Sequence, residues 1–456
     1  MQYVIAGGLG LAGALSPVAL AVVAGIVCVG ALVFVKPPAT KPPAADVWLF
    51  GGLVFVVGFV SAVIWGHRDL PAMGDDPLTY HLPAAVTWLQ QGRICIYETW
   101  NFNPANSYSP LAGSIFAIWL LAPLGNDVLA RFLQSPAVVA VFLAAVQIAR
   151  RLGAAPAVSV LLGLACALCR PIVGQSAMAK DDVFLTAFVL LGIGGLAMPG
   201  PAAPMRIGLA FALAAATKYT ALYSLIPILL LVFPPRKVFS WRIATVAVTV
   251  VVLAGPWYLR NWLFFGNPVF PVMVAPGGVE LFPGLFETTV SPRLRQPQEL
   301  WRLFVAGYWG LGTAVALLVA AGWVGAWLSK PGTKLRQPLA RLVLTGPLVA
   351  GLVFFASSPY AELRFVQVWI AVMICAMALL PHRIQTPAAA GVAIAAISTS
   401  FAPQFLLSFV VVAVGVSAGA ILLRSLLGGR PSLRPYVLAT GAIVAAASVW
   451  VWWRAY

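Results

Sequence analysis

Charged residues are scarce in this sequence. Only 9% of its 456 residues are Asp, Glu, Lys or Arg, whereas a soluble globular domain carries about 25%. The chain is also 61% hydrophobic, and apolar stretches long enough to cross a bilayer recur along it. A soluble fold around a single core is therefore excluded, and lipid is the expected solvent.

Several chemical signatures are missing as well. The three histidines and five cysteines form no spacing typical of a metal site, and no glycine-rich phosphate loop, nucleophile elbow or dinucleotide fingerprint is present. We therefore expect no metal and no cofactor. Cys166 and Cys169 lie within an apolar stretch, which favours packing over redox chemistry. The first 35 residues carry no charge, so a cleavable signal peptide with a basic start is not expected.

The few basic residues are unevenly placed. Sixteen of the 28 fall in one set of short loops, together with a single acid, Asp46. They are Lys36, Lys41, Arg150, Arg151, Arg206, Arg236, Lys237, Arg242, Lys330, Lys334, Arg336, Arg341, Arg383, Arg424, Arg430 and Arg434. Basic clusters between apolar spans fix the orientation of a membrane protein, so these loops are predicted to face the cytoplasm. This placement explains the net charge of +16 without nucleic acid as a partner.

The alternate loops hold the other 11 of the 12 acids. They are Asp69, Asp75, Asp76, Glu98, Asp127, Asp181, Asp182, Glu280, Glu287, Glu299 and Glu362. The positive-inside rule places these loops outside the cytoplasm. Chemistry that depends on carboxylates is therefore expected on the extracytoplasmic face of a cell (inner) membrane.

The apolar segments predict an all-α, polytopic protein with about 13 or 14 spans in a single transmembrane domain, residues 1–456. The segments are 3–35, 46–65, 127–149, 156–173, 182–198, 206–217, 219–233, 243–259, 303–328, 341–357, 364–380, 386–402, 405–423 and 436–453. Pro17 interrupts the first segment, which is long for one span and short for two. Residues 206–233 are divided near Lys218, because a single helix there would reverse the sides of all the loops that follow. Residues 386–456 offer helices and no soluble domain.

Two large outer loops, 66–110 and 260–302, are rich in aromatic residues and are expected to be ordered. Short apolar stretches at 78–90 and 110–124 predict helices that lie along the membrane interface.

The first outer loop contains two adjacent carboxylates, Asp75 and Asp76, before Pro77 and the pair Tyr80-His81. Four apolar side chains are expected on one side of the helix that follows, namely Leu78, Leu82, Val86 and Leu89. Asp76 before Pro77 suits a helix cap. The same carboxylate suits a general base that deprotonates an acceptor hydroxyl. His81 fits a structural hydrogen bond as well as a role in the site.

Two further charged groups border apolar spans. Lys180-Asp181-Asp182 is either an ordinary solvated helix end or part of a site, because ionisable groups near lipid tend to be functional. Lys218 lies between alanine-rich stretches, where it must reach an anion or extend to the interface.

Two arginines lie on the predicted outer side. Arg260 follows Trp257 and Tyr258 at the end of a span, and its geometry suits a phosphate oxygen. Arg364 either pairs with Glu362 or provides a second phosphate ligand.

Taken in order, these fragments resemble the GT-C membrane glycosyltransferases, specifically the bacterial relatives of protein O-mannosyltransferases and of the aminoarabinose transferase (glycosyltransferase family 39-like proteins). The matching positions, spread over residues 46–380, are Asp75-Asp76 with Tyr80-His81, Asp181-Asp182, Thr217-Lys218, Pro256 to Asn261, and Glu362 with Arg364 and Phe365.

The resemblance implies transfer of one sugar, with inversion, from a polyprenyl-phosphate donor to an extracytoplasmic lipid, glycan or protein. It implies Asp76, or Asp75 beside it, as the catalytic base, and Lys218, Arg260 and Arg364 as ligands of the donor phosphate. Contacts with substrate are implied for Tyr80, His81, Lys180, Asp181, Asp182, Tyr258 and Glu362. The family's soluble C-terminal domain has no counterpart in this sequence, which leaves a small or lipid acceptor open.

Other functions remain as alternatives. A transporter or flippase of lipid-linked or polyanionic substrates usually places charges at the bilayer midplane and shows paired repeats, and neither feature is visible. An O-antigen ligase or polymerase would leave the paired aspartates without a role. A non-catalytic scaffold does not explain why the acids gather on one face.

Overall fold

The fold is described from a computed structural model of the chain. It describes residues 1–34, 46–66, 74–100, 102–232, 240–275, 279–287, 297–306, 310–329, 337–357 and 362–400. The spans expected at 405–423 and 436–453 lie outside these ranges, as do parts of both large loops.

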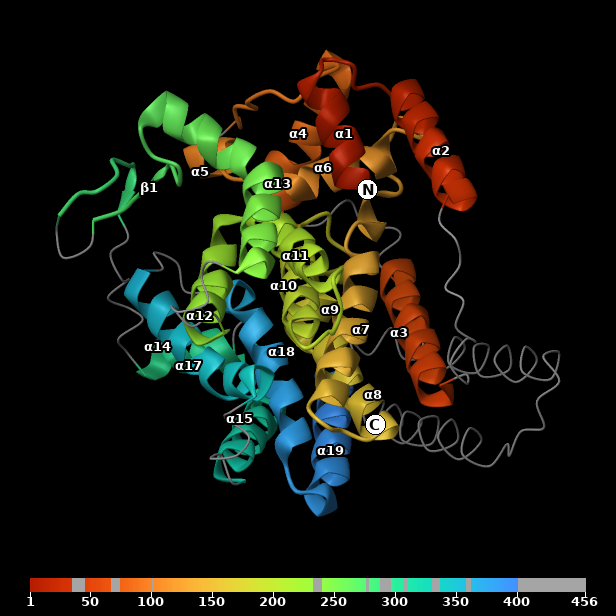
Figure 1. Cartoon of the computed structure of the whole chain (residues 1–456), viewed down its shortest axis with the longest axis vertical. Coiled ribbons are helices and arrows are strands. Elements are labelled where there is room, and N and C mark those ends of the chain that lie inside the picture. Colours follow the sequence, from red (N-terminus) through yellow and green to blue (C-terminus); the bar gives the residue numbers. More distant parts are fainter. Residues whose placement is uncertain are drawn as a thin grey trace, which may run out of the picture.

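The described part of the chain is almost entirely helical (Figure 1). Its α-helices are α1 (Gln2–Leu11), α2 (Pro17–Phe34), α3 (Val47–Gly66), α4 (Leu82–Gln91), α5 (Pro104–Tyr108), α6 (Ala112–Leu121), α7 (Ser135–Arg151), α8 (Pro156–Ala167), α9 (Arg170–Ser176), α10 (Asp182–Leu196), α11 (Ala203–Thr217), α12 (Leu222–Val232), α13 (Trp241–Phe265), α14 (Pro297–Trp301), α15 (Thr313–Leu328), α17 (Pro338–Ser357), α18 (Gln367–Ala376) and α19 (His382–Ser400). Short 3-10 or π-helical turns are η1 (Pro77–His81), η2 (Ala130–Phe132), η3 (Tyr219–Ala221), η7 (Arg302–Ala306), η8 (Leu363–Phe365) and η9 (Met377–Leu379). Two short strands, β1 (Val272–Met273) and β2 (Phe286–Glu287), pair in parallel.

The helices confirm the predicted all-α, polytopic membrane class. Three described helices are long and apolar enough to cross a membrane, namely Val47–Gly66, Ala130–Arg151 and Trp241–Phe265. A fourth candidate is the pair α8 and α9, which is bent by 60°. Most of the other expected spans appear as shorter apolar helices of 10–17 residues.

Small residues allow the central helices to approach closely. Helix α10 packs against both α7 and α11, and α11 packs against α13. A Cβ atom at Gly192 of α10 would lie 2.1 Å from the Phe211 ring of α11, so no larger residue fits there. Small residues at such crossings are typical of membrane helices, where contact between backbones replaces the hydrophobic effect.

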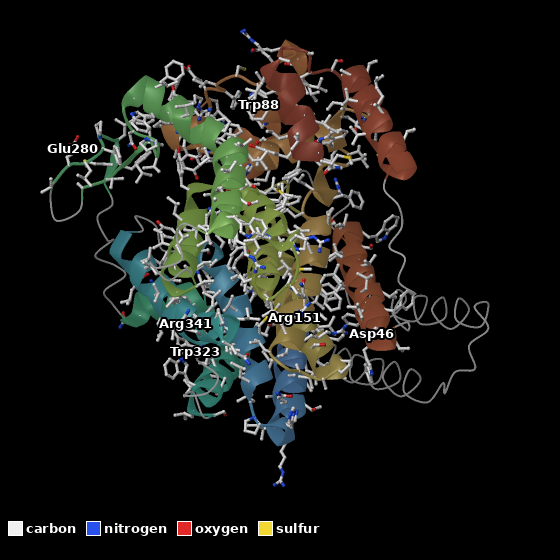
Figure 2. The ribbon with its side chains drawn as sticks, viewed as in Figure 1. Asp46, Trp88, Arg151, Glu280, Trp323 and Arg341 are labelled. Atoms are coloured by element: carbon white, nitrogen blue, oxygen red, sulfur yellow. The ribbon has the colours of Figure 1, made fainter. Side chains whose placement is uncertain are left out.

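The two ends of the molecule carry different groups. Helices α1, α4 and α6 gather at one end, and α15 and α19 lie at the other (Figure 1). In Figure 2, Glu280 lies towards the first end, whereas Asp46, Arg151 and Arg341 lie in the opposite half. Asp46, the one acid expected among the basic loops, forms an ion pair with Arg150.

Two helix breaks predicted from the sequence are observed. The first apolar segment divides into α1 and α2 before Pro17. Helix α11 ends at Thr217, and Lys218 is extended, with φ −163° and ψ 148°, before η3 begins. The break lets the lysine leave the helix surface and reach a partner on α10, as described below.

The helix after Asp76 differs from the prediction. Leu78 and Val86 are exposed, whereas Leu82 is buried, so the four apolar residues expected on one side do not share a face. The turn Pro77–His81 is π-helical, and the wider turn shifts the register of the following residues. As a result, the buried side holds Tyr80, His81 and Trp88.

Candidate active site

A compact ion-pair cluster joins residues that are far apart in the sequence. It contains Asp76 before η1, Lys180, Asp181 and Asp182 at the start of α10, Lys218 after α11, and Glu362 and Arg364 around η8. The start of α7 lies beside the start of α10, because Gln134 accepts a hydrogen bond from the Val183 amide. Since Arg150 and Arg151 are at the other end of α7, the cluster lies at the end of the bundle opposite to those arginines.

Asp76 is the most exposed of the three aspartates in this cluster. Its Oδ2 atom lies 3.0 Å from Lys180 Nζ and also accepts a hydrogen bond from Arg364 Nη1. The carboxylate makes no capping hydrogen bond to the helix that follows it. The alternative of a simple helix cap is therefore wrong, because the side chain points to the two cations instead.

Asp182 lies at the buried centre of the cluster. Its side chain has 0% exposure, with Oδ1 2.9 Å from Lys218 Nζ and Oδ2 3.4 Å from Arg364 Nη1. Arg364 also donates to Glu362. The solvated helix end considered for Lys180-Asp181-Asp182 is therefore wrong, since all three residues are buried. Lys218 does not extend freely to the interface, because Asp182 holds it.

Asp181 and His81 form a second buried layer. His81 Nε2 lies 3.5 Å from Asp181 Oδ1, and His81 Nδ1 lies 3.3 Å from the Ser114 hydroxyl. Neither His81 Nε2 nor Asp181 Oδ1 has a hydrogen-bond partner among the described residues. Gly113 of α6 makes this approach possible, because a Cβ atom there would lie 2.4 Å from Asp181 Cβ.

The electrostatics of the outer part of the cluster follow from these contacts. Burial alone would raise the pKa of Asp76, but the positive charges of Lys218, Arg364 and Lys180 outweigh it and hold that pKa well below its ordinary value. Burial lowers the pKa of His81, against the opposing effect of Asp181, and so favours the neutral ring. Burial also raises the pKa of Tyr80, which therefore stays protonated.

Arg260 belongs to a neighbouring polar group and not to the cluster. Its Nη2 donates to the Tyr108 carbonyl at 2.6 Å, and its Nε donates to Asn261 Oδ1 at 3.0 Å. Asn261 Nδ2 donates to the carbonyls of both Tyr108 and Phe270. The Tyr219 hydroxyl, which has one hydrogen to donate, lies 3.1 Å from the Tyr108 carbonyl and 2.6 Å from the Phe270 carbonyl. These contacts connect the two outer loops, and we call Tyr219, Arg260 and Asn261 the loop clamp. Since Tyr219 follows Lys218 directly, the clamp adjoins the cluster.

Two other predicted site residues lie outside the cluster. Asp75 is exposed and makes no ion pair with the residues that the structure describes. Tyr258 donates a hydrogen bond to the Ala215 carbonyl at 2.9 Å and packs against the Tyr219 ring. Of the two aspartates, only Asp76 reaches the cations.

A layer of amide side chains beneath the cluster was not predicted. Gln367 Nε2 donates to the Asp182 carbonyl and to Thr186 Oγ1, and its Oε1 accepts from Gln175 Nε2. Gln134 also donates to the carbonyls of Gln175 and Met178. The sequence feature that could have indicated this layer is a glutamine at the border of an apolar span. An amide buried there without a hydrogen-bond partner costs free energy.

An apolar groove lies between α17 and the start of α18. It has a volume of about 530 Å³ and is lined by Val366 just before α18, by Trp369 and Met373 of α18, by α17 and by Phe304. On its α17 side, Leu348 and Leu352 are exposed on the outside of the bundle.

No group of three or more His, Cys, Asp or Glu side chains within the described ranges is arranged to hold a metal ion.

No protein-family model matches the chain, and no curated protein matches it. Among solved structures, the chain is similar to the crystal structure of ArnT from Cupriavidus metallidurans bound to undecaprenyl phosphate, with 16% identity and a TM-score of 0.47 over 90% of this chain and 71% of that one. It is also similar to the apo crystal structure of the same ArnT, with 14% identity and a TM-score of 0.40 over 94% of this chain and 71% of that one.

Proposed function

We propose that the protein is an inverting membrane glycosyltransferase. It transfers one sugar from a polyprenyl-phosphate donor to an acceptor hydroxyl on the extracytoplasmic side, with Asp76 as general base. The observation that carries this proposal is a partly exposed carboxylate held by two cations, one of which, Arg364, precedes the groove residue Val366 by two positions.

The groove and the cations match the two parts of such a donor. Val366, Trp369 and Met373 repeat at helical spacing and offer an apolar surface about 10 Å long to a polyprenyl chain. Arg364 precedes this surface by two residues, so it is placed to contact the phosphate of a lipid that lies in the groove. Lys218 reaches the same centre from α11 through Asp182.

The reaction needs few groups. The acceptor oxygen attacks the anomeric carbon as its proton moves to Asp76, and the bond from that carbon to the phosphate oxygen breaks. The electron pair stays on the polyprenyl phosphate, where Arg364 and Lys218 stabilise the growing negative charge. A single displacement of this kind inverts the anomeric configuration.

The remaining predicted residues have supporting roles in this proposal. Lys180 holds Asp76, and Asp181 and Asp182 hold Lys218 and Arg364. Tyr80 and His81 are buried in the cluster and are assigned to substrate contact together with Glu362 at its exposed edge; Tyr258 supports the Tyr219 ring. The proposed location is the cell (inner) membrane as a multi-pass protein.

The test is transfer of labelled sugar from a panel of polyprenyl-phosphate sugars by purified protein, with membrane extract as acceptor. We expect Asp76→Asn to lower transfer by about 10²–10⁴-fold, the usual contribution of a general base. Asp75→Asn is the matched control and is expected to keep nearly full activity, because Asp75 is exposed and outside the cluster. No transfer from any donor by the wild type, with both variants unchanged, would favour a transporter instead.

A further inference from the structure

The cations assigned to the donor phosphate are already occupied. Lys218 contacts Asp181 and Asp182, Lys180 contacts Asp76, and Arg364 contacts three carboxylates. Within the described residues, four carboxylates thus face three cations, so these groups with all acids ionised carry one excess negative charge. A phosphodiester brings another negative charge, and placing it beside the existing carboxylates is unfavourable. A carboxylate therefore has to give way before the phosphate binds.

The carboxylates differ in how firmly they are held. Asp182 is fully buried and uses both oxygens, one for Lys218 and one for Arg364. Asp76 has a side chain that is 22% exposed, and both of its cations contact the same atom, Oδ2. Asp76 lies in the short helical turn directly before η1, whereas Asp182 is the first residue of the packed helix α10. Glu362 is more exposed, at 36%, but it contacts Arg364 alone, so its exchange would free one cation. Among the aspartates, exchange therefore costs least at Asp76, and it frees both Lys180 and Arg364.

We propose that the donor phosphate binds by replacing Asp76 at Arg364, and that the carboxylate released in this exchange is the base for the transfer. The inference rests on the proposed function and adds the order of events. In the resting protein Asp76 is held by cations and is a weak base. It becomes a stronger base only when the phosphate neutralises those cations, so donor binding itself prepares the catalyst.

The same exchange also completes the cycle. The acceptor proton moves to Asp76 as the sugar transfers, and polyprenyl phosphate remains at Arg364 and Lys218. Once Asp76 has lost this proton to water, its carboxylate again competes for Arg364 and helps to displace the product. Each step is a proton transfer or an exchange of ion partners, and no further reactant is needed.

The groups that face Asp76 determine how pH affects the exchange. The cations are Lys180, Lys218 and Arg364, and the other titratable neighbours are Tyr80, His81, Asp181 and Asp182, with Glu362 on the far side of Arg364. In the resting state the cations hold the pKa of Asp76 low. In the complex the phosphate offsets their charge, so this pKa rises. When the pH falls towards this raised pKa, Asp76 takes up a proton as the phosphate binds. The affinity for the phosphate therefore increases at low pH.

The experiment measures binding of a sugar-free polyprenyl phosphate to the full chain in nanodiscs, by calorimetry between pH 5 and pH 8. We expect Asp76→Asn to bind at least about tenfold more tightly than the wild type at pH 7, because the competing carboxylate is gone. Asp75→Asn removes an equal charge one residue away and is expected to change affinity less than about twofold, since solvent screens an exposed charge.

A second measurement compares the protons that the wild type and Asp76→Asn take up when the phosphate binds. The probe phosphate titrates in every sample, so the proton uptake of Asp76→Asn is subtracted from that of the wild type. Extra uptake by the wild type at low pH supports the exchange. Equal uptake in both proteins, or equal tightening by the Asp75 and Asp76 variants, overturns it while the transferase remains. Absence of binding by every form overturns the proposed donor itself.

Discussion

Two arginines near the same end of the bundle meet different partners. Arg364 contacts the carboxylates of Asp76, Asp182 and Glu362. Arg260 donates to a main-chain carbonyl and to an amide oxygen in the loop clamp. A carboxylate that pairs with an arginine can be replaced by another anion at little cost. If the Tyr108 carbonyl loses its hydrogen bond to the half-buried Arg260, however, the loop loses a contact that holds it in place. The first arrangement suits ligand exchange and the second suits support.

The largest effect on stability is expected for a substitution of Asp182. Asp182→Ala leaves Lys218 and Arg364 without the buried carboxylate that holds both, so we expect a loss of about 3–5 kcal/mol in the free energy of unfolding. The measurement is chemical unfolding in mixed micelles.

Asp75→Asn is again the matched control, with an expected change within about 0.5 kcal/mol, because its carboxylate is exposed. If Asp182→Ala were as stable as the control, the cluster would not contribute to the fold, and its burial would need another explanation.

The residues of the cluster could be predicted from the sequence, because charge is rare in this chain. Asp76, Asp181, Asp182, Lys218 and Arg364 stand out among apolar neighbours, and the distribution of basic loops places them on one face. The same signal also singled out Arg260, which the structure places in the loop clamp. A sequence shows that an arginine lies on the outer side but not whether a carboxylate or a carbonyl meets it, since that depends on how the loops fold back.

The helical class and most spans could also be predicted, since each rests on a local apolar stretch. The face of the helix after Asp76 could not, because a π-helical turn has no clear signature in Pro77–His81. The pairing of His81 with Asp181 depends on this turn and on the space at Gly113. Both are tertiary features, which composition and periodicity do not contain.

A smaller loss of stability is expected for a substitution of Gly113, which packs against the cluster around Arg364 and not against the loop clamp. In Gly113→Ala the new methyl group would lie 2.4 Å from Asp181 Cβ, so α6 and the start of α10 must move apart. We expect a loss of about 1–3 kcal/mol in stability, together with weaker polyprenyl-phosphate binding, because the cluster is displaced.

Unfolding and binding measured on the same samples test this prediction. Gly51→Ala is the control, since no atom lies within 4 Å of a Cβ atom at that helical position. That variant should be as stable as the wild type or slightly more so, because alanine favours the helix.

The smallest effect on ligand binding is expected at Arg260. Arg260→Ala should change polyprenyl-phosphate affinity by less than about twofold, because Asn261 and Tyr219 still hold the Tyr108 carbonyl and the cluster keeps its cations. Its effect should appear instead as faster amide exchange in residues 102–110 and 266–275, which the clamp connects. Lys218→Ala is the contrasting variant, with an expected loss of about tenfold or more in affinity. Equal losses in both variants would show that Arg260 does reach the phosphate, and that donor binding draws the clamp into the cluster.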